Sequence, residues 1–213
     1  MKLSDKYAPK TLADVLGQDR AVERVRRIVG REGFDGAAFM IYGPSGMGKS
    51  SIARALANEL AASEFDVIEL DGEACTVDAV RDARRTMNLT TLSGGFRVWI
   101  VNESHAMTPK AVQAWLTCLD PLPKNNVVIF TTTEYSENLY GEFTTPFASR
   151  CMMIPLTNQG MAKALAPRLK AIAMAENLDG QPEEAYVKLM ARPDVKNNVR
   201  AALNMIESGC MME

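Results

Sequence analysis

Apolar residues fall into short continuous runs that alternate with stretches of helical spacing between residues 37 and 133. The continuous runs predict strands at residues 38–42, 65–70, 96–101 and 127–133. Helical spacing of apolar positions, together with capping residues, predicts helices at about 19–31, 50–63, 76–87 and 109–119. Strands that alternate with helices in this way indicate an α/β fold, with a parallel, doubly wound sheet flanked by helices.

After Thr157 the strand pattern stops. Helical spacing predicts helices near residues 158–177, 182–191 and 196–208. Pro167 predicts a start or a kink within the first of these helices. The expected organisation is an α/β domain at residues 1–156, followed by a small helical domain at residues 157–213.

The strand at residues 38–42 leads directly into Gly43-Pro44-Ser45-Gly46-Met47-Gly48-Lys49-Ser50-Ser51. This is the P-loop, or Walker A, pattern, in which glycines let backbone N–H groups point at phosphate and a helix N-terminus adds partial positive charge. Lys49 is expected to reach the outer phosphates. Ser50, which directly follows the lysine, is preferred over Ser51 as a Mg²⁺ ligand. A glycine-rich turn that binds nothing is the alternative, but the match at every fixed position argues against it.

The strand at residues 96–101 ends in a second polar motif, Asn102-Glu103, at the edge where open α/β sheets place their ligands. This ending resembles a Walker B strand. Glu103 is then the expected general base for an attacking water, and Asn102 is expected to hold Mg²⁺ through water. Thr132 or Thr133, at the end of the next strand, is expected to orient water near the outermost phosphate.

Taken together, these motifs resemble the AAA+ ATPases, and within them the clamp-loader subunits: the bacterial gamma/tau subunit, the small subunits of replication factor C and their viral relatives. The matching segments lie at residues 6–9 and 15–18 (KYAP and VLGQ), 102–107 (NESHAM), 113–116 (QAWL), 120–123 (DPLP), 149–151 (SRC) and 198–204 (NVRAALN). The resemblance therefore extends from Lys6 to about Glu207. Ser149-Arg150-Cys151 is the most discriminating of these segments.

The resemblance implies a role for two arginines. In this family the arginine of the SRC motif acts as an arginine finger on a neighbouring subunit's ATP, which implies that Arg150 acts in trans. The lid motif implies that Arg200 contacts phosphate within its own subunit as sensor 2. Each arginine also has a structural alternative: Arg150 as the partner of a local carboxylate, and Arg200 as a solvated helix residue.

Residues 6–18 form the last segment for which the resemblance implies contact with the nucleotide. Pro9 and Gly17 predict an extended arm rather than a helix. The family's corresponding arm lies over the adenine, which implies that Tyr7, Pro9, Leu16 and Gly17 contact the base. His105 is the only histidine and has no flanking metal ligands, so a coupling role beside Glu103 is favoured.

Composition adds few constraints. The net charge of −2 indicates no general attraction to DNA or to an acidic membrane, although local patches remain compatible with DNA contact. The four cysteines form no C-x-x-C pair, so neither a zinc site nor a disulfide framework is indicated. No signal-peptide core and no apolar run approaching the ~20 residues of a membrane span is present. A cytoplasmic setting is expected.

The sequence departs from the family pattern in three places. Asn102 replaces the Walker B aspartate, which predicts weaker metal binding and slower hydrolysis. Leu116 and Thr117 stand where family members carry basic residues that face DNA. The sequence ends at Glu213, just past the lid, so we expect no collar domain, and assembly would rest on AAA+ contacts or on another subunit.

The sequence therefore predicts a clamp-loader-like AAA+ ATPase that binds ATP and Mg²⁺. It would hydrolyse ATP at an interface with another AAA+ subunit and remodel a DNA-associated protein such as a sliding clamp. Two alternatives stay open. One is an ATP-binding structural or regulatory subunit with little turnover, which Asn102 and the missing collar favour. The other is a different DNA-processing AAA+ motor for branch migration or transposition, against which the SRC motif argues.

Overall fold

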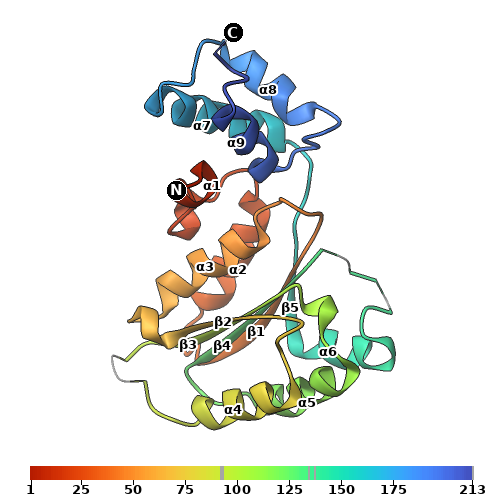
Figure 1. The fold of residues 1–213 in the computed structure, drawn as a ribbon. Helices are drawn as coiled ribbons and strands as arrows, with labels where there is room; N and C mark the ends of the chain where they lie inside the picture. Colours follow the sequence, from red (N-terminus) through yellow and green to blue (C-terminus); the bar gives the residue numbers. More distant parts are fainter. Residues whose placement is uncertain (92–93, 134, 137, 213) are drawn as a thin grey trace.

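The computed structural model describes residues 1–91, 94–133, 135–136 and 138–212. These residues contain a five-stranded sheet in the order β2-β3-β4-β1-β5 (Figure 1). Its strands are β1 (Gly36–Tyr42), β2 (Val67–Asp71), β3 (Arg97–Asn102), β4 (Asn126–Thr132) and β5 (Cys151–Pro155). Every pairing is parallel, so the predicted parallel α/β sheet is confirmed.

Helices follow the strands in the predicted alternation. They are α1 (Leu3–Lys6), α2 (Asp19–Val29), α3 (Lys49–Leu60), α4 (Val77–Met87), α5 (Pro109–Leu119), α6 (Thr144–Arg150), α7 (Met161–Ala175), α8 (Glu183–Ala191) and α9 (Val199–Glu207). The predicted caps are present, because the hydroxyls of Thr76 and Thr108 accept hydrogen bonds from the third residue of α4 and of α5. Among the described residues, no helix combines the length and the apolar character needed to cross a bilayer.

Alternate residues of each strand face two separate cores, one on each side of the sheet. Phe39 and Ile41 of β1 pack in the core that also contains Val25 of α2 and Leu56 of α3. The intervening residues of β1 pack in the other core, which contains Trp115 of α5. Figure 1 shows α2 and α3 on one side of the sheet and α4 and α5 on the other. Because both faces are covered, every residue of β3 and β4 is buried.

Several local features differ from the sequence-based expectation. The short elements α1, α6 and β5 were not predicted, and β5 forms an edge of the sheet beside β1. The arm at residues 6–18 contains a short 3₁₀ turn at Leu12–Asp14, which Thr11 and Asp14 close with a capping box. Helix α7 runs from Met161 through Pro167 to Ala175, so no new helix starts at the proline.

The C-terminal helices α7, α8 and α9 lie together at one end of the molecule, on the side of α2 and α3 (Figure 1). One buried side chain, Gln18, joins the arm to the segment that leads into these helices. Its amide nitrogen donates to the carbonyl of Thr157 at 2.9 Å, and its amide oxygen accepts from the Thr157 N–H at 3.1 Å. Gln18 thus satisfies both backbone groups of the connecting residue.

This arrangement predicts that Gln18→Ala destabilises the fold. The substitution removes both partners of the Thr157 backbone, and an unmade hydrogen bond at a partly buried site costs about 1 kcal/mol or more. We expect a lower midpoint of urea unfolding, measured by circular dichroism. Gln159→Ala, at an exposed side chain in the same segment, is the control and should leave the midpoint unchanged. Equal midpoints for the two variants would contradict a linking role for Gln18.

Candidate nucleotide-binding site

The loop between β1 and α3 has the backbone geometry that a phosphate cradle requires. Gly46 and Gly48 adopt φ angles of 76° and 89°, in the left-handed region that glycine enters without strain. Gly46 has a further reason to be glycine, because a Cβ there would lie 2.0 Å from the side chain of Asn198. The loop is therefore shaped both by its own turn and by the residue that caps α9.

Lys49 places a buried cation inside this loop. The residue is only 6% exposed, and its ammonium donates to the carbonyls of Gly43 at 2.9 Å and Pro44 at 3.0 Å. Burial lowers the pKa of Lys49; the nearby Glu103 opposes this shift and Arg200 adds to it. Because both hydrogen-bond partners are neutral, the ammonium keeps an unbalanced charge that an anionic ligand would neutralise. A phosphate group fits this requirement.

Ser50 and Asn102, the two residues predicted to hold Mg²⁺, are in direct contact. The hydroxyl of Ser50 donates to Oδ1 of Asn102 at 3.0 Å, and Thr131 of β4 donates to the same oxygen at 3.1 Å. The Asn102 amide nitrogen donates in turn to Oε1 of Glu69 on β2. Oxygen ligands from a few side chains, completed by phosphates and waters, are how Mg²⁺ is usually bound. The donor set at this edge therefore fits Mg²⁺ held together with a nucleotide.

Glu69 and Thr131 are the residues that sequence reasoning missed here. Glu69 is fixed by Arg54 of α3, whose guanidinium nitrogens lie 2.9 and 2.7 Å from the two carboxylate oxygens. Partial burial alone would raise the pKa of Glu69, but the bonds to Arg54 and Asn102 outweigh it and leave the pKa lowered. The carboxylate is therefore ionised at neutral pH.

Glu103, the predicted general base, has a left-handed backbone with φ 46° and ψ 47°. For a residue with a Cβ this conformation costs about 1 kcal/mol, and such strain is concentrated at functional sites. Its N–H donates to Thr131 at 3.3 Å, while its half-exposed carboxylate lies 3.5 Å from both the Thr133 hydroxyl and Nδ1 of His105. The carboxylate is thus open to water and held beside two polar groups.

Thr132 and Thr133 both lie at the end of β4, next to the Asn102-Glu103 pair, but they face different neighbours. Thr132 is buried, with its hydroxyl 3.2 Å from Nδ1 of His105, whereas Thr133 faces Glu103. His105 therefore lies between Thr132 and Glu103, beside the carboxylate as expected, and its coupling role stays a prediction. The choice between the two threonines as the water-orienting residue stays open.

Helix α9 begins directly beside the loop. The N–H of Val199 donates to the carbonyl of Gly46 at 3.3 Å, and Asn198 caps the helix by accepting from the N–H of Ala201. Arg200, in the first turn of this helix, is exposed and close enough to Lys49 for its charge to lower the lysine pKa. Lys49 and Arg200 therefore both place positive charge near the loop.

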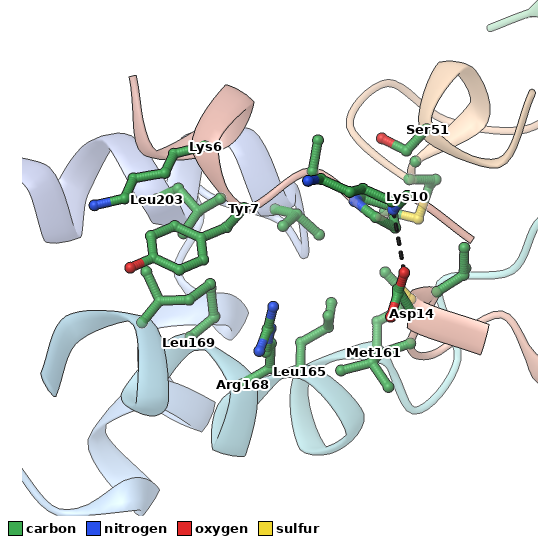
Figure 2. A pocket seen from close by; sticks show the side chains of 18 residues that line it. Lys6, Tyr7, Lys10, Asp14, Ser51, Met161, Leu165, Arg168, Leu169 and Leu203 are labelled. Atoms are coloured by element: carbon green, nitrogen blue, oxygen red, sulfur yellow. Dashed lines mark hydrogen bonds between the residues drawn. The ribbon is translucent and has the colours of Figure 1, made fainter. Parts of the chain in front are cut away.

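The arm, the loop and α7 together enclose a pocket of about 310 Å³ beside the loop (Figure 2). Six of the residues predicted to bind the nucleotide line this pocket. They are Tyr7, Pro9 and Leu16 of the arm, and Met47, Gly48 and Ser51 of the loop and the start of α3. Gly17 does not line the pocket. It packs so closely against Met161 that a Cβ on Gly17 would lie 2.7 Å from the methionine sulfur. The far wall is mostly apolar and comes from Met161, Leu165, Leu169, Ile172 and Leu203. Such a wall suits a flat heterocycle.

Arg150 lies outside this cluster. Its guanidinium donates to Asp120 at 2.8 Å and to the carbonyl of Pro146 at 2.9 Å. The next residue, Cys151, pairs with Ala38, which precedes Gly43 by five residues, or about 16 Å along the strand. An arginine side chain does not bridge that distance, so Arg150 does not belong to the phosphate site of its own chain.

A P-loop after an internal strand, β1, with a polar pair at the same edge of the sheet where β3 ends, two strands away, defines a P-loop nucleotide-binding protein. Residues 39–155 match the family described as "ATPase family associated with various cellular activities (AAA)", and the chain belongs to this family. The predicted likeness to clamp-loader subunits is also confirmed by relatives. The replication factor C small subunits of Haloarcula marismortui and Methanothermobacter thermautotrophicus are 28% and 27% identical over 96% and 98% of the chain.

The subunit tau of DNA polymerase III from Bacillus subtilis is 26% identical over 94% of the chain. The chain spans 61% and 63% of the two small subunits and 38% of subunit tau. Among solved structures, the RuvB Holliday junction branch migration motor of Thermotoga maritima superposes with a TM-score of 0.72 and 17% identity, covering 94% of this chain and 64% of that one. At this identity the likeness establishes the fold alone.

The geometry of Lys49 predicts that Lys49→Ala abolishes nucleotide binding. The substitution removes the buried ammonium from a loop whose turn depends on glycine, so the loop itself should remain folded. Isothermal calorimetry with ATP and Mg²⁺ should show no measurable binding. Lys188→Ala, at an exposed position in α8, is the matched control. Unchanged ATP affinity in Lys49→Ala would refute the phosphate site.

Proposed function

We propose that this protein binds ATP with Mg²⁺ and hydrolyses it at an interface with a neighbouring AAA+ subunit. The observation that carries the proposal is the separation of Arg150 from the loop of its own chain. The loop, the Ser50–Asn102 pair and Glu103 meet at one edge of the sheet, whereas Arg150 lies about 16 Å away along the strands. A second subunit would supply the missing arginine.

In this proposal each residue has a defined task. The loop N–H groups and Lys49 hold the phosphates, and Ser50 with Asn102 holds the metal. Bound Mg²⁺ neutralises charge on the phosphate oxygens. Glu103 accepts the proton of the attacking water, and Arg200 adds positive charge from the same chain. Arg150 serves the site of the adjacent subunit.

The proposal extends to the partner. Relatives are subunits of replication factor C and of DNA polymerase III, and the sequence resembles clamp-loader ATPases along most of its length. We infer that the ATP cycle remodels a DNA-associated protein such as a sliding clamp. The branch-migration alternative gains no support from RuvB, since that likeness concerns the fold. A regulatory subunit with little turnover remains the second candidate, because Asn102 carries no charge.

Glu103→Gln should retain ATP binding but lose hydrolysis, because an amide cannot accept the proton of water. The side chain is half-exposed and its removal leaves the core intact, so the protein should remain folded. Steady-state phosphate release and calorimetric ATP affinity, measured on the same preparation, separate the two effects. Glu207→Gln, at an exposed position in α9, is the matched control. Turnover at the wild-type rate in Glu103→Gln would exclude this residue as the base.

Arg150→Ala should leave ATP binding by the isolated chain unchanged and reduce hydrolysis by the assembly by ~10³-fold or more, the usual effect of an arginine finger. Asp120→Asn is the matched control, because it removes the same ion pair while keeping the arginine. If the arginine were only structural, both substitutions would cause a similar loss.

Mixing Arg150→Ala with Lys49→Ala provides the test in trans. In mixed assemblies some interfaces combine an intact loop from one variant with an intact Arg150 from the other, so activity should partly return. Native mass spectrometry would confirm that mixed assemblies form. Mixed assemblies without any recovery of activity would argue that Arg150 does not act on a neighbour.

A further inference from the structure

Asn102 presents a problem that an aspartate at the same position would not have. A carboxylate offers oxygen on both sides, whereas an amide offers oxygen on one side and a donor on the other. Asn102 can therefore serve a metal only in one of its two orientations. Something must fix the amide so that its oxygen, and not its nitrogen, faces Ser50.

The neighbouring strand supplies that constraint. Oδ1 of Asn102 accepts from Ser50 and Thr131, and Nδ2 donates to the carboxylate of Glu69. An ionised carboxylate has no proton to donate, so it can pair only with the NH₂ end of the amide. Glu69 thus excludes the flipped orientation, which would place two oxygens together.

Glu69 is itself held by the helix that carries Ser50. Arg54 lies four residues after Ser50 in α3, and residues at this spacing share one face of a helix. The same face therefore directs the Ser50 hydroxyl to Asn102 and the Arg54 guanidinium to Glu69, at 2.7 and 2.9 Å. Both ends of the amide are thus fixed from one helix.

We propose that Glu69 is a positioning residue of the metal site, which orients the Asn102 amide so that its oxygen faces Ser50. The proposal rests on the proposed function, since it concerns the Mg²⁺ of the ATP site. It also explains how an asparagine at position 102 can serve in a metal site where the family has an aspartate. The carboxylate expected at position 102 stands on the neighbouring strand, one hydrogen bond away, where it is paired with Arg54.

A direct consequence concerns Asn102→Asp. This substitution restores the family residue, but it places a second carboxylate against Glu69 and removes the donor that joins the two side chains. Like charges at hydrogen-bond distance repel, so the variant should not bind Mg²⁺ better than the wild type. Exchanging the two groups, as in the double variant Glu69→Gln/Asn102→Asp, restores one amide and one carboxylate in contact.

The test measures Mg²⁺ dependence of nucleotide binding rather than turnover. A non-hydrolysable ATP analogue is titrated into the wild type, Glu69→Gln, Asn102→Asp and the double variant at increasing Mg²⁺, and again in EDTA. Glu69→Gln should require ~10-fold more Mg²⁺ for half-maximal enhancement of binding, the usual effect of losing an outer-shell partner. Asn102→Asp should require at least as much Mg²⁺ as the wild type, and the double variant should return toward the wild-type value.

Affinity in EDTA should be equal for all four proteins, which shows that each remains folded. Glu64→Gln, at an exposed position just before β2, is the control and should leave the Mg²⁺ dependence unchanged. An unchanged Mg²⁺ requirement in Glu69→Gln, or additive losses in the double variant, would overturn the role of Glu69 and leave the ATP site standing. ATP binding that survives Lys49→Ala would instead overturn the ATP site, and this proposal with it.

Discussion

Parallel, in-register pairing of the central strands is the constraint on which the site depends. Tyr42 of β1 pairs with Thr132 of β4, and Asp71 of β2 pairs with Asn102 of β3. Parallel strands end at the same edge, so the loop after β1 and the polar ends of β3 and β4 meet without any long connection. A register shift of one residue would turn Asn102 to the opposite face of the sheet, away from α3 and Ser50.

Local chemistry could be predicted from the sequence, whereas contacts between strands could not. The loop was predictable because its glycines and Lys49 are adjacent in the chain, and Glu103 because it directly follows a recognisable strand. Glu69 was missed because its importance depends on β2 lying next to β3, which no local pattern specifies. The edge strand β5 was missed because it is short and leads into a helical region. The domain boundary at residue 156 and the roles of the site residues stay predictions.

The Asp120–Arg150 ion pair shows why a residue's role is harder to predict than its place. The sequence left open whether Arg150 pairs with a local carboxylate or serves a neighbour, and the structure contains the local pair at 2.8 Å. The two roles are compatible. The arginine side chain is about one-third exposed, and an ion pair in that environment contributes only about 0–1 kcal/mol. Such a pair can hold a guanidinium in place and still release it to a stronger anion.

The pocket beside the loop is built from segments that are distant in sequence: the N-terminal arm, the start of α3 and helix α7. A molecule that fills it touches all of them at once, so its binding energy is shared across the junction between the sheet and the C-terminal helices. By thermodynamic linkage, such a ligand favours whichever relative placement of these segments lets it make every contact, by as much as its affinity differs between placements. A ligand in this cavity would therefore favour the angle between the sheet and the C-terminal helices at which it makes the most contacts.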